Sequence, residues 1–173
     1  MEKVKLPKKV DPARCALNRL HYDGVFSASL MPRVAESTQG IRGDINVSLN
    51  FGADAQGLLV MQGKTCMTVS LQCQRCNEPF DTTIESEFTY TPLRKNAEVP
   101  DMPEDYDTVE VDDVGEIDLV ELIEDELILS LPLIPAHENE QCSLGKFDQS
   151  FGTIPTAEDR PNPFAALEGL KRK

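Results

Sequence analysis

The sequence predicts an α+β fold, in which an antiparallel β-sheet meander of long, bent strands is covered by one acidic amphipathic helix and ends in extended tails. Apolar and polar residues alternate through residues 44–51, 58–71 and 80–90, which is typical of strands with one buried face. Apolar residues recur at helical spacing through residues 117–131. A sheet with one apolar face needs such a cover, and closure of the bent strands into a barrel-like sheet is the alternative arrangement.

Turn signals separate the three strands. Residues 52–57 contain two glycines and an aspartate, which predicts a turn between the first two strands. Gly63 falls in register with the apolar positions of the second strand, so we expect a bulge or bend there. A tight turn around Cys73 and Cys76 joins the second strand to the third, and Asn77 suits a positive φ at its exit.

The other segments of the predicted domain give weaker patterns. The first residues of the chain predict a short edge strand that runs into a turn. Residues 13–36 are ambiguous, and we interpret them as short helical turns interrupted by Gly24 and Pro32. Residues 95–113 predict a mobile, acid-rich loop that ends in a short strand at residues 109–111.

The covering helix has recognisable ends. Asp118 precedes the apolar run, with Glu121 three positions on, as in a capping box, and Pro132 stops the helix. Acidic residues occupy the polar face: Glu121, Glu124 and Asp125. These carboxylates could act as an acid–base pair or hold a metal, but a solvated helix face is the better interpretation because no His or nucleophile lies beside them. The same three residues are candidate contacts for a basic partner.

Cys73 and Cys76 form a Cys-x-x-Cys turn at the tip of the predicted hairpin. Such a turn can supply half of a tetrahedral zinc site, because its spacing lets both sulfur atoms face one metal. It also occurs in thiol–disulfide oxidoreductases, where a helix follows, whereas Pro79 and a strand follow here. In the simplest interpretation, both thiols are small, partly buried apolar groups.

His137 and Cys142 are the remaining pair with metal-ligand chemistry at close spacing. Together with Cys73 and Cys76 they would complete a Cys₃His site for zinc, the one cofactor that the sequence suggests. The alternative is an exposed loop histidine and an ordinary thiol.

Charge is distributed unevenly along the chain, whose formal net charge is −13. Residues 77–140 carry twenty acidic side chains against two basic ones, whereas the first twenty residues and the last three are basic. An acidic body is repelled by phosphate and suits a basic protein partner, and ribosomal proteins are the commonest basic proteins of a bacterial-type cytosol. Acidic charge can also serve solubility alone.

The sequence favours a cytoplasmic location. It shows no apolar run of about 18 residues that would span a membrane, and no signal peptide. Its cysteines are odd in number, which favours reduced thiols: Cys15, Cys66, Cys73, Cys76 and Cys142. We expect no membrane partner and no small-molecule substrate.

The chain divides into three predicted parts. Residues 1–142 form a single α+β domain, residues 143–161 an acidic, Pro-containing linker, and residues 162–173 a short basic helix or tail. The last part could dock on its own domain or on a partner. It closes on three candidate partner-binding residues: Lys171, Arg172 and Lys173.

Several of these features together resemble the YceD/DUF177 family, nearly from end to end. The features are the Cys73–Cys76 turn, residues 115–119 at the start of the acidic helix, Leu131-Pro132 after it, and the segment from Pro161 to Lys173. Many members carry further cysteines after the helix, where this sequence has His137 and Cys142. The family is also similar to proteins described as metal-binding and nucleic-acid-binding.

The resemblance implies a role in accumulation of 23S ribosomal RNA and biogenesis of the large ribosomal subunit, in bacteria and chloroplasts. We interpret the protein as a non-enzymatic factor that binds a basic ribosomal protein, an assembly factor or the rRNA itself, since the sequence shows no catalytic motif. Two alternatives remain, an rRNA-processing enzyme and a zinc or redox sensor that acts through Cys73 and Cys76.

Overall fold

The computed structural model describes residues 4–137 and Cys142, and it has the mixed α+β composition that the sequence predicts. Its elements in chain order are β1 (Lys9–Val10), α1 (Pro12–Leu17), β2 (His21–Phe26), the 3₁₀ helix η1 (Ala28–Leu30), α2 (Pro32–Glu36), β3 (Ile41–Ala53), β4 (Leu59–Gln72), β5 (Pro79–Arg94), β6 (Asp107–Val111), β7 (Ile117–Asp118) and α3 (Leu119–Leu129). The predicted linker at residues 143–161 and the predicted C-terminal segment at residues 162–173 lie outside the described residues.

Five strands form the main sheet in the order β2-β3-β4-β5-β6. Strands β2 to β5 are antiparallel, which confirms the predicted meander. Strand β6 departs from it, since it pairs parallel to the end of β5 from Tyr90 to Arg94. Residues 95–106 between the two strands are long enough to bring the chain back to the start of this pairing. The described residues form no pair between β2 and β6, so the sheet is open rather than barrel-like.

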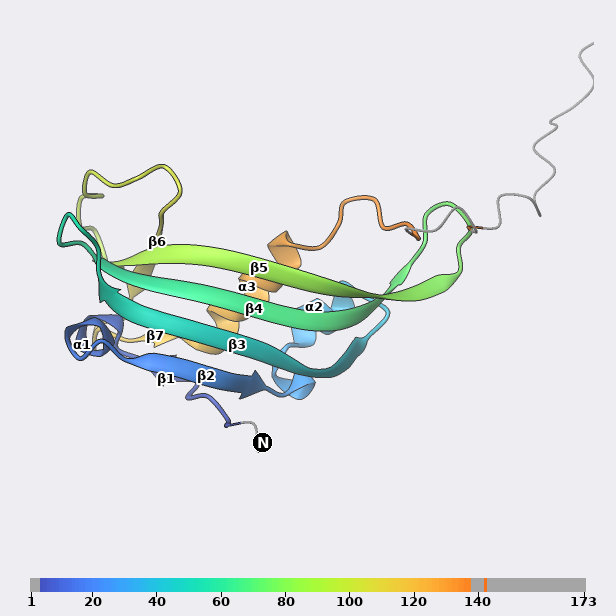
Figure 1. Ribbon diagram of the computed structural model, residues 1–173, viewed down its shortest axis with the longest axis horizontal. Coiled ribbons are helices and arrows are strands. Elements are labelled where there is room, and N and C mark those ends of the chain that lie inside the picture. The colour runs from blue at the N-terminus through green and yellow to red at the C-terminus, as the bar shows by residue number, and fades with distance from the viewer. Residues whose placement is uncertain (1–3, 138–141, 143–173) are drawn as a thin grey trace, which may run out of the picture. The chain divides into compact units, whose positions relative to one another are not determined.

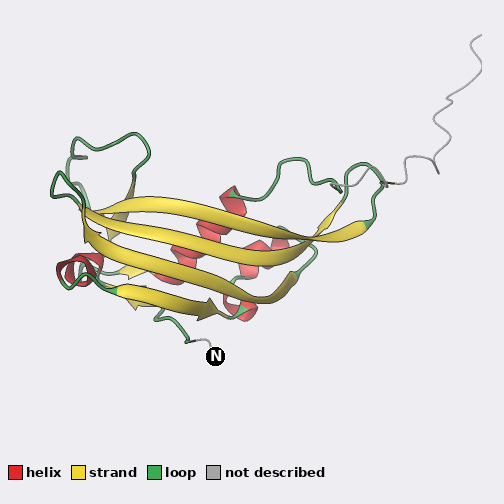
Figure 2. Cartoon of the chain, in the orientation of Figure 1, coloured by secondary structure: helices red, strands yellow, loops and turns green. Residues whose placement is uncertain are grey.

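The helices cover one face of this sheet and leave the other face open. Figures 1 and 2 show α2 and α3 behind the strands, with α1 at one end. The core between the layers contains apolar side chains from all three central strands and from α3, among them Ile45, Leu49, Met61, Met67, Ile84, Leu119, Ile123 and Leu127. Burial of each such side chain stabilises the fold by roughly 1.5–3 kcal/mol, so the sheet–helix contact is the main source of stability.

The helical interpretation of residues 13–36 is correct for α1 and α2 but wrong for β2. Residues His21–Phe26 pair along the edge of β3. Gly24 lies inside this strand because the N-terminal segment crosses it closely: a Cβ atom there would lie 2.3 Å from the carbonyl oxygen of Val4. The contact is made by a segment distant in sequence, so local pattern gives no sign of it.

The predicted bulge at Gly63 is also wrong. Gly63 pairs in regular register with Leu49 on β3 and Phe88 on β5. The register shift instead lies on β3 between Arg42 and Asn46. Glycine is needed at position 63 because the Phe88 ring lies over it, and a Cβ atom there would be 2.0 Å from that ring.

Helix α3 is capped as predicted, since Asp118 accepts hydrogen bonds from the backbone N–H groups of Val120 and Glu121, at 2.9 and 3.2 Å. Its polar face is less solvated than predicted, because Glu124 is 5% exposed and Glu126 9% exposed. Glu126 accepts hydrogen bonds from Ser86 and Tyr90 of β5, which fastens the helix to the sheet.

Two further segments complete the domain. Strand β1 pairs with β7 in a separate two-stranded sheet, and Lys5 bridges to Val25 at the edge of β2. The short strand predicted at residues 109–111 is confirmed within β6. Within the part of the chain that the structure describes, no helix has the length and apolar character that crossing a membrane requires.

Candidate metal centre

The tip of the β4–β5 hairpin positions the first two candidate ligands. Cys73 donates its backbone N–H to the carbonyl of Glu78 at 3.0 Å and accepts a hydrogen bond from Asn77 at 2.8 Å. Asn77 has a φ of 59°, as the sequence predicts for the residue that leaves the turn. These bonds close the turn and hold the thiols of Cys73 and Cys76 at the end of the hairpin.

The segment that follows α3 brings the other two candidate ligands to this tip. Gln74 donates its backbone N–H to the carbonyl of Pro135 at 2.9 Å, and the Arg75 guanidinium donates to the carbonyl of His137. The ring of His137 packs against that of Phe80, with 4.8 Å between centroids. The imidazole is therefore oriented by the same turn that carries the first two cysteines.

All four residues that the sequence singles out meet here. One ligand atom from each of Cys73, Cys76, His137 and Cys142 lies within 4.8 Å of the others. The sulfur atoms of Cys73 and Cys142 are 3.3 Å apart, and the sulfur of Cys76 is 3.5 Å from Nδ1 of His137. A tetrahedral site with metal–sulfur bonds of about 2.3 Å separates neighbouring sulfurs by about 3.8 Å, so these distances fit a single ion.

Three of the four groups are buried, and their thiols differ in acidity. Burial raises the pKa of Cys73, but hydrogen bonds from the backbone N–H groups of His137 and Arg75, with others, outweigh it and bring the pKa to about 5. Burial and the neighbouring Cys73 sulfur raise the pKa of Cys142 to about 12. The lowered pKa of Cys73 favours its thiolate, the form that binds metals.

The arrangement suits a closed metal centre better than a catalytic one. Four protein ligands complete a tetrahedral set, whereas catalytic sites keep one position for water or substrate. The Cys76 thiol and His137 could also form a nucleophile–base pair. However, the His137 ring is packed on Phe80, and the buried sulfurs of Cys73 and Cys142 fill the adjoining space.

The three acidic candidates on α3 have separate environments. Glu121 is exposed, and Asp125 forms an ion pair with Arg33 at 2.6 Å. Glu124 is buried, and its carboxylate accepts hydrogen bonds from the backbone N–H groups of Arg33 and Val34 at 2.6 and 3.2 Å. It caps the first turn of α2, where Met31 has no capping side chain. The prediction of a solvated face is therefore wrong for Glu124.

An acidic hollow of about 470 Å³ beside Glu121 was not predicted as a site. Its acidic lining comes from β6, the following turn and the start of α3: Glu110, Asp112, Asp113, Glu116, Asp118 and Glu121. The acid-rich sequence before α3 signals this charge, but not its gathering around one hollow. The three basic candidates, Lys171 to Lys173, lie outside the described residues.

The comparisons with known proteins agree on one family. A model of the family described as "Large ribosomal RNA subunit accumulation protein YceD" matches residues 61–171. A protein of that name from Haemophilus influenzae is 47% identical over 174 residues, which cover 100% of both chains. Among solved structures, none matches the chain. The resemblance drawn from the Cys73–Cys76 turn and the acidic helix is confirmed, and the chain belongs to the YceD family.

Proposed function

We propose that this protein supports accumulation of 23S ribosomal RNA, and hence biogenesis of the large ribosomal subunit, by binding rather than by catalysis. The observation that carries the proposal is the end-to-end similarity to a relative named for large ribosomal RNA subunit accumulation. The similarity covers both the hairpin tip and the acidic body. We therefore assign the role named for the relative to the whole chain.

Binding fits the geometry better than rRNA processing does. Metal-dependent nucleases draw carboxylates together around accessible ions. Among the described residues, the group whose ligand atoms converge is the cysteine–histidine cluster, and no carboxylate belongs to it. The acidic hollow does not supply such a cage, because Asp112 is held by Lys9 at 3.2 Å and by the backbone of its own turn.

The cofactor in this proposal is a structural zinc ion held by Cys73, Cys76, His137 and Cys142. When bound, zinc would cross-link the hairpin tip to the segment after α3, which is otherwise tied to it by few hydrogen bonds. A sensor role for the same cysteines is the second candidate, since the sulfur atoms of Cys73 and Cys142 lie 3.3 Å apart.

Metal analysis distinguishes a zinc site from a cluster of ordinary thiols that binds no metal. Protein purified without chelator is expected to contain one zinc ion per chain, and Cys76→Ser is expected to lose most of it. Cys66→Ser is the matched control, because Cys66 lies on β4 outside the cluster. Zinc content that is equally low in all three proteins would contradict the proposed cofactor.

The partner in this proposal is a basic protein of the large subunit or an assembly factor, with rRNA reached through the basic ends of the chain, including Lys171, Arg172 and Lys173. Capture from lysate with Glu121→Lys and Asp113→Lys tests the acidic surface, since both side chains are exposed. Reduced capture of large-subunit components is expected. Charge reversal at Glu124 is unsuitable for this test, because loss of its carboxylate would remove two hydrogen bonds at the start of α2.

Function in cells is tested by deleting the gene and measuring the ratio of 23S to 16S rRNA. The ratio is expected to fall on deletion and to recover when this chain is supplied. An unchanged ratio would refute the proposed role, and cleavage of precursor rRNA by the purified protein would refute the non-catalytic part of it.

A further inference from the structure

Strand β5 is longer than the strand that covers its outer edge. It runs from Pro79 to Arg94, but β6 pairs with it only from Tyr90 to Arg94. Figure 1 shows β5 at the border of the sheet, with β6 against one end only. From Pro79 to Thr89, therefore, β5 has β4 on one side, and no strand of residues 4–137 lies on the other.

The hydrogen-bonding register shows which backbone groups face outward. Cys73 donates to Glu78 at the hairpin tip, and bonded pairs recur at every second residue of an antiparallel ladder. Even-numbered residues of β5 therefore bond to β4, and odd-numbered residues direct their N–H and C=O groups away from it. Pro79 agrees with this, because its missing N–H would point outward, where no strand needs it.

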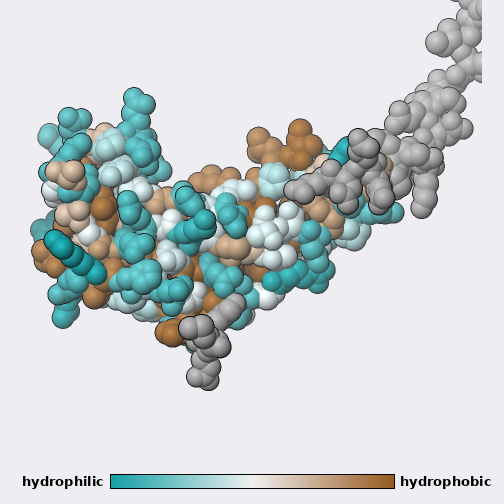
Figure 3. Space-filling model, in the orientation of Figure 1, coloured by the Kyte–Doolittle hydropathy of each residue, from teal (hydrophilic) through white to brown (hydrophobic). Residues whose placement is uncertain are grey.

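The free positions form a continuous row along the edge: Asp81, Thr83, Glu85, Glu87 and Thr89. The outward backbone groups of this row form no hydrogen bond to another described residue. Their side chains lie on the open face of the sheet, which is mainly hydrophilic in Figure 3. An edge of this kind is a template for an added strand, as in complexes formed by β-augmentation.

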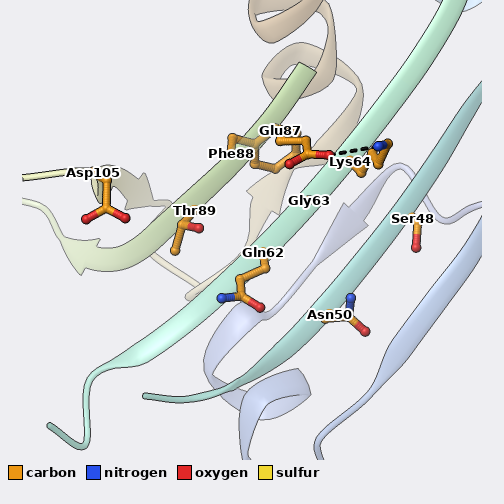
Figure 4. A pocket seen from close by; sticks show the side chains of 9 residues that line it. All are labelled: Ser48, Asn50, Gln62, Gly63, Lys64, Glu87, Phe88, Thr89 and Asp105. Carbon is orange, nitrogen blue, oxygen red and sulfur yellow. Dashed lines mark hydrogen bonds and ion pairs between the residues drawn. The ribbon is translucent and has the colours of Figure 1, made fainter. Parts of the chain in front are cut away.

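The side chains of this row favour a basic segment. Asp81 is paired with Arg42 at 3.2 Å. Glu87 is paired with Lys64 at 2.7 Å, and Figure 4 marks this second contact. Glu85 lies 4.0 Å from the same lysine. The three carboxylates of the row are therefore paired with only two basic side chains, Arg42 and Lys64. All these groups are exposed, and exposed ion pairs exchange readily for others. Lysines or arginines of an incoming strand would find carboxylates at three of the five outward positions of the edge, Asp81, Glu85 and Glu87.

We propose that an extended, basic segment of a protein partner adds to the sheet as a strand along residues Asp81–Thr89 of β5. The inference rests on the proposed function, for which it supplies the docking element. A second copy of the chain is a poorer occupant, because antiparallel pairing of two such edges would set acids against acids. RNA is disfavoured because these side chains repel phosphate.

Amide hydrogen exchange measured by NMR tests the proposal residue by residue. The probe is a synthetic peptide of about ten alternating lysine and valine residues. Its binding is expected to slow exchange of the Thr83, Glu85 and Glu87 amides by about tenfold or more, while the amides already bonded to β4 change little. A peptide of alternating glutamate and valine is the control. Binding of the lysine peptide without slower exchange at these odd-numbered amides would overturn the proposal.

A single substitution gives an independent test. Thr83→Pro removes one outward N–H that β4 does not use, so it is expected to weaken peptide binding about tenfold or more. Thr83→Val keeps the N–H and is expected to bind as the unsubstituted protein does. Equal binding by both variants would contradict the proposal, and the exchange measurement decides the question by itself if Thr83→Pro does not fold.

Two other outcomes separate this inference from its alternatives. Slow exchange at the odd-numbered amides that depends on protein concentration without peptide would identify a second copy as the occupant and overturn the proposal. Normal 23S rRNA levels in cells that carry Thr83→Pro would contradict docking through this edge but leave the proposed function intact. A 23S rRNA level unaffected by gene deletion would instead contradict the proposed function.

Discussion

At the scale of single residues, the roles of Gly63 and Glu124 depend on neighbours that are distant in the sequence, so the local sequence does not reveal them. Gly63 lies beneath the Phe88 ring on the adjacent strand. Glu124 caps the first turn of α2, which is about 90 residues away in the chain. Helical spacing assigns Glu124 to a solvated face, since periodicity identifies the face but not what packs on it. In contrast, Cys-x-x-Cys spacing and the tolerance of Asn77 for positive φ are local, and the structure agrees with both.

Gly63→Ala is expected to destabilise the protein by about 1–3 kcal/mol, because the new methyl group would displace the Phe88 ring. Urea unfolding measures the change in free energy. Gly52→Ala is the control, since no atom lies within 4 Å of the added Cβ at that position of β3. Equal stability of the two variants would show that the Phe88 contact does not require glycine.

Glu124→Ala is expected to cost about 1–3 kcal/mol, because two backbone N–H groups at the start of α2 lose their acceptor. Asp125→Ala removes only a half-exposed ion pair with the same arginine and is expected to cost no more than about 1 kcal/mol. Thermal or urea unfolding compares the two. A larger cost for Asp125→Ala would contradict the capping role of Glu124.

At the scale of elements, the sequence predicts those whose pattern is local and misses those that depend on pairing. Strands β3, β4 and β5 alternate cleanly and were predicted. Strand β2 was missed because only its partner β3 defines it as a strand. The parallel direction of β6 depends on the path of residues 95–106, which composition does not specify. The four candidate ligands were predicted because few other residues of the chain have suitable chemistry.

Metal removal is expected to loosen the hairpin tip selectively. Chelation should speed exchange of the Gln74 amide, which is bonded to Pro135, by about tenfold or more, while amides within β4 stay as slow as before. Hydrogen exchange by NMR, with and without chelator, measures both. Unchanged exchange at Gln74 would contradict a metal that ties the tip to the segment after α3.

At the scale of the whole molecule, the cysteine–histidine cluster proposed to hold zinc lies apart from the strand edge proposed as a docking site. The cluster lies at the hairpin tip, and the edge runs along β5, which leads away from that tip. Twenty acidic side chains against two basic ones in residues 77–140 are the basis of the proposal that the protein binds a basic partner. Family membership connects the chain to accumulation of the large ribosomal RNA subunit, and neither the fold nor the charge alone would do so.

Crosslinking in cells, followed by identification of the attached protein and RNA, tests the central claim most directly. The account predicts crosslinks from the acidic body to basic proteins of the large ribosomal subunit or its precursors, accompanied by 23S rRNA. Crosslinks confined to the small subunit, or to proteins unconnected with ribosomes, would contradict it.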